Sequence, residues 1–556
     1  MDAVTRAYRR RWWALGVLGL VLIAIAMDGL ILNVALPTLV RDLHASASQL
    51  QWIVDAYALA FAGLLLSAGS LGDRFGRKLI LNAGLTIFVT ASVASAFAGS
   101  AGMLIGTRAA MGAGAALIMP STLSIITHTF PAKERGRAVG IWAGLSGFGI
   151  ILGPTVGGLL LDNFWWGSVF LINAPIVAVA LLGTRLFVPE SRDPDATPLD
   201  LAGALLSAAG LLALVYGIIE VPGRGWADAL TLGSFSGAAV LLWLFAAWEL
   251  RSAHPLLNLR FFRNPRFSAA SIALTLVFFG LNGALFLLTQ YMQFVRGYTP
   301  LQAGVRLLPI LTVLAAAPLS ALAVEKAGTK VVVGAGLLLD ALGLGMASTV
   351  SPGTGYGPLA AALAVIGIGQ GLAMAPAVVS IMGSLPRAKL GVGSAMNSTT
   401  QMVGGALGVA VIGSALSSAY TSSIGPALSG LPASAAAARD SVGAATEVAA
   451  RLGPAGRALL TAAQSAFVNG MDTAMLVAIG AAVAGALVAL LFLPSRPAQL
   501  AEAGPQPPAV PLGPEPPVAS LDPEPPVASL DPEPPAAQPG PESPAASVGP
   551  GPTAAR

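Results

Sequence analysis

Long apolar runs recur along almost the whole chain and limit what it can fold into. Each run is close to the roughly 20 residues that an α-helix needs to cross a bilayer. The runs cover about 13–36, 50–72, 78–98, 103–125, 138–160, 168–188, 199–220, 231–250, 267–293, 303–325, 329–349, 357–383, 393–418 and 473–493. Hydrophobic residues make up 55% of the 556 residues and charged residues only 10%, which excludes a soluble globular fold. We expect an all-α polytopic membrane protein with about fourteen spans.

Basic residues distinguish the two sides of the predicted membrane. Residues 1–12 form a basic segment with four arginines, and most other Lys and Arg residues fall in alternate loops. The short loops on the opposite side hold only Arg41, Arg224 and Arg296. Because Lys and Arg are retained on the inner face, a retained first span and an even span number place both termini in the cytoplasm, in a multi-pass protein of the cell membrane. The charge therefore has a topological explanation, and no nucleic-acid partner is expected.

Two intervals depart from the pattern of spans. The interval 419–472 is long and too charged to cross, so we expect an external loop that can hold a surface amphipathic helix. Residues 494–556 repeat the sequence Pro-Glu-Pro-Pro-Val-Ala-Ser-Leu-Asp and cannot bury a core, which predicts a disordered cytoplasmic tail. Two interpretations of this tail are open: it is a ligand for Pro-binding modules, or it is a low-complexity segment that is tolerated without a function.

A weak internal repeat indicates two halves. Residues 321–330 follow the tenth run with an acid, a base and a glycine in the order found in residues 69–78. Two six-helix bundles, over 13–188 and 267–493, with two inserted helices over 199–250, would explain this repeat. The predicted fold class is thus two six-helix bundles plus two extra central helices.

Catalytic chemistry has no residues to carry it in this sequence. The chain contains no cysteine, and His44, His128 and His254 are too far apart for a metal-ligand spacing, so no metal site is expected. No H-E-x-x-H, G-x-S-x-G or P-loop lysine pattern occurs, so we expect neither an enzyme nor a cofactor. A non-transporting sensor would need an added soluble domain, which the tail does not provide.

A charged hinge follows the second apolar run. It reads Gly69-Ser70-Leu71-Gly72-Asp73-Arg74-Phe75-Gly76-Arg77-Lys78, and its ionic groups must lie at a membrane face. Its glycines allow tight turning, its aspartate can accept hydrogen bonds from helix-end amides, and its basic residues carry the inside signal. The order G-x-L-x-D-R-x-G-R-K resembles the loop signature of the major facilitator superfamily of secondary transporters. A basic loop without a transport role is the alternative.

Three ionisable residues lie inside apolar spans. At 1.5 Å per residue, Asp28 lies roughly 12 Å, and Asp55 and Arg108 each roughly 8 Å, from the outer ends of their helices. An ionised acid in hydrocarbon is costly, so we expect a role in proton or cation binding, against the alternative of a structural hydrogen bond. The secondary candidates are the buried polar residues Gln290, Asp340, Asn397 and Gln401.

The fifth span carries a row of small residues around a proline. Its members are Gly149, Gly153, Pro154, Gly157 and Gly158. Small residues allow close helix packing, and the proline removes a helical hydrogen bond. The order G-x-x-x-G-P-x-x-G-G resembles the antiport signature in the exporter branch of the same superfamily. Over residues 10–495, the ordered set resembles the fourteen-span drug:proton antiporter family.

This resemblance implies proton-coupled efflux of hydrophobic, cationic drugs, antiseptics or antibiotics, with a small molecule, protons and the lipid bilayer as partners. A monomer is expected. The implied roles are a conformational latch at Gly69, Asp73, Arg74, Gly76, Arg77 and Lys78, proton handling at Arg108, an antiporter helix around Gly153 and Pro154, and proton or cation binding at Asp28 and Asp55. A dedicated exporter or importer of one metabolite or self-made antibiotic is the alternative.

Overall fold

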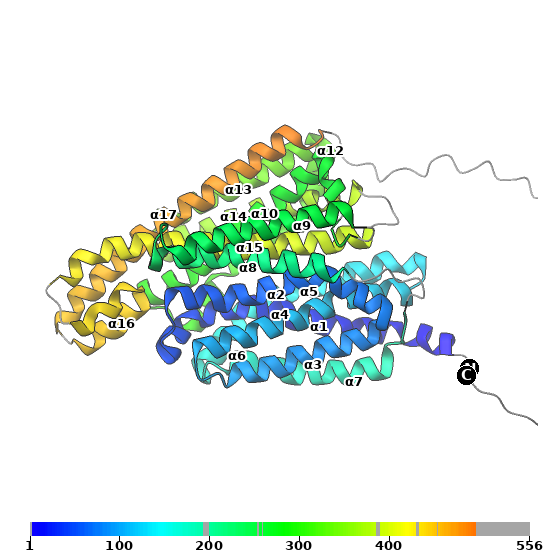
Figure 1. Cartoon of the computed structure of the whole chain (residues 1–556), viewed down its shortest axis with the longest axis horizontal. Coiled ribbons are helices and arrows are strands. Elements are labelled where there is room, and N and C mark those ends of the chain that lie inside the picture. The colour runs from blue at the N-terminus through cyan, green and yellow to red at the C-terminus, as the bar shows by residue number, and fades with distance from the viewer. Residues whose placement is uncertain are drawn as a thin grey trace, which may run out of the picture. The chain divides into compact units, whose positions relative to one another are not determined.

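The computed structural model describes residues 3–192, 200–252, 255–257, 259–384, 390–429, 433–452 and 454–495. Across these ranges, the regular secondary structure is helical (Figure 1). Twelve of the described helices are long and apolar enough to cross a membrane, and the bent helix α2 makes thirteen. Helix α5 (Ala132–Asn163) stands at the position of the fifth predicted span, where residues 138–160 carry no charge. The predicted all-α membrane fold is confirmed.

The helices before residue 192 form a first bundle. It consists of α1 (Ala3–Leu43), α2 (Ala47–Phe75), α3 (Arg77–Ala96), α4 (Ala101–Thr129), α5, α6 (Ser168–Leu171) and α7 (Asn173–Phe187). Here α1 packs on α5 and α7, while α4 packs on α2 and α3.

The helices after residue 264 form a second bundle. It consists of α10 (Pro265–Gln290), α11 (Pro300–Arg306), α12 (Thr312–Ala327), α13 (Thr329–Ser348), α14 (Tyr356–Gly383), α15 (Leu390–Leu428) and α17 (Pro454–Phe492). Helix α10 packs on α15 and α17, and α14 packs on α12 and α13. These pairings repeat the neighbour relations of the first bundle in the same chain order, as expected of an internal repeat.

Two inserted helices, α8 (Leu201–Arg224) and α9 (Ala229–Arg251), connect the bundles. Helix α8 packs on α2 and α15, so it lies at the junction of the two bundles (Figure 1). Its Val215 belongs to a buried cluster with Leu59 of α2 and Ala410 of α15. Helix α9 packs on α8 and is mostly exposed to the surroundings.

The interval 419–472 is helical over most of its described length, rather than a loop between two spans. Helix α15 continues to Leu428, a 3₁₀ helix covers Ala433–Arg439, α16 covers Val442–Arg451, and α17 already begins at Pro454. The surface helix that the sequence allowed is therefore present, and the continuation of α15 and α17 adds to it, because charge argues against membrane crossing but not against a helix that continues beyond the bilayer. We call the end of the bundles that carries this segment the α16 end.

Helix α16 is capped and packed, which explains why it forms. The amide of Ala444 donates a 3.1 Å hydrogen bond to the side chain of Ser441, a standard N-cap. The helix buries Val442, Ala445 and Ala449 and packs on α17. It thus has one buried apolar face, as an amphipathic surface helix should have.

The opposite end, which we call the Asp73 end, carries the charged hinge and the start of α1. The first helix begins at Ala3, so most of the predicted basic segment 1–12 is helical. Arg11 donates to both carboxylate oxygens of Glu134 on α5, at 2.8 and 3.0 Å. The Arg11 hydrogen bond lowers the pKa of Glu134, a residue outside the predicted span.

Glycines with positive φ stand at equivalent turns of the two bundles. Gly76 (φ 115°) joins α2 to α3, and Gly328 (φ 83°) joins α12 to α13. A side chain at Gly76 would meet Glu190, and one at Gly328 would meet the backbone of Ser495. Each glycine is therefore packed against the segment that follows the last helix of its own bundle, α7 or α17. The tail beyond Ser495 lies outside the described residues.

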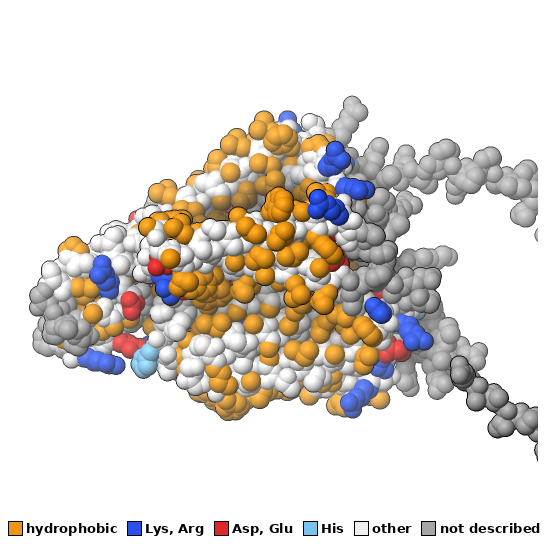
Figure 2. All heavy atoms as spheres, viewed as in Figure 1, with side chains coloured by type: hydrophobic (Ala, Val, Ile, Leu, Met, Phe, Trp, Pro, Cys, Tyr) orange, Lys and Arg blue, Asp and Glu red, His pale blue; other side chains and the backbone are white. Residues whose placement is uncertain are grey.

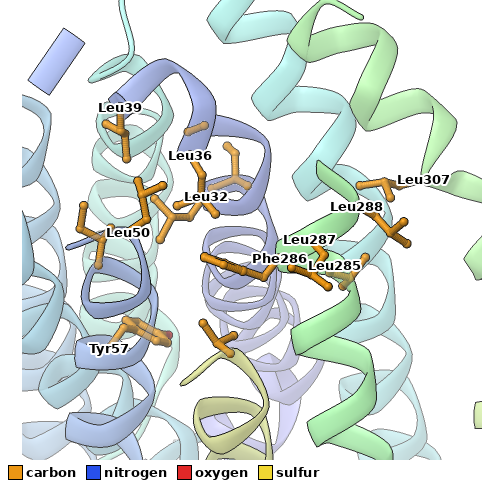
Figure 3. Packing of buried hydrophobic residues seen from close by; sticks show 14 of the residues in the cluster. Leu32, Leu36, Leu39, Leu50, Tyr57, Leu285, Phe286, Leu287, Leu288 and Leu307 are labelled. Carbon is orange, nitrogen blue, oxygen red and sulfur yellow. The ribbon is translucent and has the colours of Figure 1, made fainter. Parts of the chain in front are cut away.

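Buried apolar side chains connect α1 and α2 with α10 in the core. Leu36 of α1, Leu50 of α2 and Phe286 of α10 belong to one cluster (Figure 3). Hydrophobic side chains cover the middle of the visible face, and charged side chains gather mainly toward its two ends (Figure 2). This distribution matches a protein whose central band contacts lipid.

Candidate functional site

A buried ion pair lies inside the first bundle. Arg108 Nη1 on α4 is 2.6 Å from Asp28 Oδ2 on α1. Asp28 is 0% exposed and Arg108 is 1% exposed. A charged pair at this depth is costly to bury, and each partner compensates the charge of the other only while the pair is intact. The structure therefore brings together two of the three ionisable residues predicted from the spans.

Polar groups from α3 and α7 support the acid. Asn173 Nδ2 lies 3.1 Å from Asp28 Oδ1 and 3.0 Å from Ser92 Oγ. The Ser92 hydroxyl donates a 2.8 Å hydrogen bond to the carbonyl of Phe170. Each Asp28 oxygen thus has its own partner, so the carboxylate orientation is fixed. Sequence reasoning missed Asn173 and Ser92, because single small polar residues are common in membrane helices.

Helix α2 holds the arginine from the other side. Arg108 Nε donates to the carbonyl of Ile53 at 3.2 Å, and its guanidinium lies 4.3 Å from the centroid of the Tyr57 ring. A guanidinium over an aromatic face gains a cation–π attraction. Gly112 makes this approach possible, because any side chain there would collide with the backbone of Tyr57. The arginine is positioned by both its charge partner and the α2 backbone.

Asp55 does not join this cluster. Ile53 and Tyr57 present one face of α2 to Arg108, and Asp55 lies about 200° around the helix from each of them. Gln51, one turn before Asp55, contacts Gly413 and Ser414 of α15. Asp55 is 0% exposed, and neither of its oxygens has a hydrogen-bond partner in the described part of the chain.

The glycine row of α5 is packed between α1 and the second bundle. Side chains at Gly149 and Gly153 would lie 2.7 Å from the carbonyl of Ile23 and 2.9 Å from that of Met27. Gly157 faces Ile31, which also lies on α1. The row therefore lets the backbones of α5 and α1 approach closely, immediately beside Asp28.

On its other side, α5 meets α11 of the second bundle. Gly158 lies against the backbone of Leu301, and Gly304 lies against the backbone of Pro154. Near this contact, Thr299 donates a 2.9 Å hydrogen bond to Asp162. We call the contact of these two helices the α5–α11 seam.

Further hydrogen bonds join the bundles toward the α16 end. Gln293 Nε2 donates to the carbonyl of Val34 at 2.8 Å. Ser414 Oγ donates to the carbonyl of Ile218 at 2.8 Å, and it lies 3.5 Å from Gln51 Oε1. Together with the α5–α11 seam, these contacts hold the bundles together on that side of Asp28.

At the Asp73 end, the charged hinge is bound to its own bundle. Arg77 forms an ion pair with Asp73 at 2.9 Å, and its amide donates to the carbonyl of Ser191 at 2.9 Å. The amides of Lys78 and Ser191 both donate to Glu190 Oε1 at 3.2 Å. Sequence reasoning missed Glu190, since it lies in a loop more than 100 residues away in sequence.

The remaining latch residues lie around this arrangement. Gly69 faces Pro120 of α4, and Arg74 and Phe75 are exposed next to each other. A side chain at Gly76 would be too close to Glu190, whereas one at Gly69 would make an ordinary contact with Pro120.

The secondary candidates lie apart from the ion pair. Asp340 is 0% exposed, and its Oδ1 lies 3.4 Å from Gln370 Nε2 within the second bundle. Gln290 donates to Phe286 of its own helix and lines a cavity of about 340 Å³ at the α16 end. Asn397 and Gln401 are half-buried on α15. Within the described ranges, no three acids or histidines are grouped as a metal site.

Comparison with known proteins decides the family. The family model described as Major Facilitator Superfamily matches residues 18–409. The chain belongs to the major facilitator superfamily. This membership and the membrane fold make it a multi-pass secondary transporter of small molecules rather than an enzyme.

Curated relatives match most of this superfamily member. It is 37% identical over 503 residues to the multidrug efflux pump LfrA of Mycolicibacterium smegmatis, covering 88% of this chain and 98% of the relative. It is 36% identical to the methyl viologen resistance protein SmvA of Salmonella typhimurium, covering 83% and 93%. It is 33% identical to the tetracenomycin C resistance and export protein of Streptomyces glaucescens, covering 90% and 95%.

Solved structures support the same fold. A bacterial homolog of the human lysosomal transporter Spinster, in an inward-facing and unoccupied conformation, matches with a TM-score of 0.62 and 19% identity, covering 88% of this chain and 98% of that chain. A POT family transporter in complex with 5-aminolevulinic acid matches with a TM-score of 0.54 and 15% identity, covering 83% and 95%.

Proposed function

We propose that this transporter exports hydrophobic, mainly cationic drugs, antiseptics or antibiotics across the cell membrane in exchange for protons. The names of its relatives, which include efflux and resistance proteins, support export. The observation that carries proton coupling is the buried Asp28–Arg108 pair, because an acid held in an apolar bundle can exchange one counter-charge for another.

The chemistry of coupling follows from the geometry of this pair. While Asp28 is ionised, Arg108 neutralises its charge. When a proton binds Asp28, the guanidinium keeps its hydrogen bond to the Ile53 carbonyl and its contact with the Tyr57 ring. A cationic substrate that approaches Asp28 competes with both the proton and Arg108 for one carboxylate. Binding of the proton therefore favours release of the cation, and binding of the cation favours release of the proton.

Movement is assigned to the bundles and to the small-residue contacts between them. In this proposal, the bundles rock about the region of Asp28, and the α5–α11 seam opens when the α16 end opens. At the seam, Pro154 and Gly158 allow this, because they present few side chains that could interlock with α11, while Gly149, Gly153 and Gly157 hold α5 against α1. The hinge around Asp73 and Arg77 acts as the latch at the other end.

Charge supports an orientation with the Asp73 end in the cytoplasm. The hinge from α2 to α3 carries Arg74, Arg77 and Lys78, and the turn from α12 to α13 lies between Lys326 and Lys330. At the α16 end, two basic groups lie beside acids, His44 beside Glu447 and Arg224 beside Glu220. An unmatched positive charge favours the inner face. Both termini would then be cytoplasmic, in a protein that acts as a monomer within the lipid bilayer.

Proton release by inverted membrane vesicles tests this function. Addition of ethidium to energised vesicles should release protons with the wild type and with Asp42→Asn, whose exposed acid lies on the same helix as Asp28. Asp28→Asn should abolish the release at equal amounts of protein in the membrane. Normal release by Asp28→Asn, with every substrate tested, would remove Asp28 from the coupling step.

A susceptibility panel in an efflux-deficient host separates broad export from dedicated export. Protection against several unrelated cations supports the proposal. Protection against one antibiotic alone would support the dedicated exporter, which the name of the tetracenomycin C relative keeps open.

A further inference from the structure

A small cavity lies where α1, α5, α10 and the α11 region meet. Its lining includes Leu30 of α1, Pro154 of α5, Leu285 of α10 and Leu307 (Leu285 and Leu307 are labelled in Figure 3). The two bundles therefore share this cavity, and Pro154 belongs both to its wall and to the α5–α11 seam. Any movement that opens the seam also changes the cavity.

Asn33 is the polar side chain in this apolar lining. It is 5% exposed, and its Oδ1 has no hydrogen-bond partner within the described ranges. The next residue, Val34, accepts the hydrogen bond from Gln293 of the second bundle, so this turn of α1 is held in place. A buried amide oxygen without a donor loses hydration without compensation. The structure thus maintains an unpaired acceptor at the edge of an apolar space.

Water is a poor occupant for this position. A buried water needs two to four polar partners, whereas the other side chains lining the cavity are leucine, isoleucine and proline. A molecule that places a small apolar group and one hydrogen-bond donor here suits the lining better, since the apolar group contacts the leucines and the donor pairs with Oδ1. Such a ligand satisfies the amide without bringing unpaired polar groups into the cavity.

We propose that Asn33 is a specificity-determining residue that accepts a hydrogen bond from an N–H or O–H group of the exported molecule. This inference rests on the proposed export function and adds a substrate class to it: apolar compounds with at least one donor. Compounds of the same shape and charge that lack a donor bind without this bond. Asn33 therefore distinguishes substrates by hydrogen bonding, while Asp28 responds to their charge.

Two dyes with the same ring system and the same permanent charge allow a direct test. Acriflavine carries amino groups with N–H donors, and N-methylacridine orange carries dimethylamino groups without them. Export of both is measured in whole cells with the wild type, Asn33→Leu, which has a similar volume without the acceptor, and Asn33→Asp, which keeps an acceptor. Asn163→Leu is the control, because the exposed Asn163 side chain bonds only the carbonyl of Leu159 on its own helix.

The expected result is a selective loss. Removing one hydrogen bond should raise the apparent KM for acriflavine roughly three- to tenfold in Asn33→Leu, with little change for N-methylacridine orange. Asn33→Asp should retain acriflavine export better than Asn33→Leu. Equal losses for both dyes at equal expression, or no loss for either, would overturn the role of Asn33 while leaving export intact. Failure of the wild type to export either dye would instead overturn the proposed function.

Discussion

Asp28 and Asp55, the acids of the first two spans, lie on contacting helices but in different surroundings. Asp28 is paired with Arg108 and bonded by Asn173, whereas Asp55 has no polar partner among the described residues. Gln51, one turn from Asp55, contacts the second bundle. Substitutions of the two acids should therefore have different consequences for stability and for transport.

Arg108→Gln should destabilise the protein more when Asp28 is present than when Asp28 has been replaced by asparagine. The single variant leaves a buried carboxylate without its cation, at a cost of about 3–5 kcal/mol. In Asp28→Asn/Arg108→Gln, that uncompensated charge is gone, so most of the stability should return although coupling stays lost. Unfolding temperatures in detergent for the two single variants and the double variant measure this. Additive losses would show that the two groups do not act as a pair.

Asp55→Asn should leave the folded state intact, because no ion pair is broken. We expect it to weaken export of the divalent cation methyl viologen more than export of the monovalent cation ethidium, since it removes an acid that can provide a second negative charge when a cation lies beside it. Transport of both cations by the variant and by the wild type gives the comparison. Equal weakening of both would assign Asp55 to folding or coupling.

Gly304→Ala should block closure at the α16 end. The added methyl group would collide with the backbone of Pro154, which has little freedom to move aside. Gly106→Ala is the matched control, because nothing lies near the position that its methyl group would take. Export should be lost in the first variant and retained in the second, at equal expression. An active Gly304→Ala protein would mean that the seam is not needed for transport.

Single cysteines can test the orientation, because the natural chain contains none. Ser422→Cys lies near the α16 end and Arg192→Cys at the Asp73 end, and both positions are exposed. A membrane-impermeant maleimide added to intact cells should label the first and not the second. The reverse pattern would invert the proposed topology and with it the direction of transport.

Acidification should weaken the contact between α1 and α5. Since Arg11 lowers the folded-state pKa of Glu134, their pairing stabilises the fold above the ordinary value of 4.5 and is lost as the pH falls through the lowered pKa. The wild type should therefore unfold at a higher temperature than Glu134→Gln at neutral pH. This difference should disappear under strongly acidic conditions. A difference that persists there would show that packing, rather than charge, accounts for the contact.

The fold could be predicted largely from the sequence, because the bilayer restricts apolar runs to helices. The hinge, the α5 glycine row and the candidates Asp28 and Arg108 were also accessible, since each depends on uncommon residues in apolar surroundings. The sequence allowed a surface helix within residues 419–472 but did not predict that α15 and α17 extend into this interval, because the charges that exclude a span do not determine what forms outside the bilayer.

Which side chains meet in the site could not be predicted, because this depends on how each helix is rotated about its axis. Depth along an axis placed Asp28, Asp55 and Arg108 at one level, yet depth does not fix the face on which a side chain lies. Only the packing of α2 between α4 and α15 separates Asp55 from Arg108. Asn173 and Asn33 have the same sequence signal, an amide in an apolar run, but one is bonded to Asp28 and the other lines a cavity.

The α5–α11 seam is formed where glycine meets main chain, at Gly158 with Leu301 and at Gly304 with Pro154. Side chains that line the neighbouring cavity contribute little to this fit. The lining can therefore change during evolution without disturbing the mechanical contact, provided that the glycines are kept. If the seam keeps its glycines while the cavity lining varies, one scaffold can acquire resistance to new compounds through few substitutions.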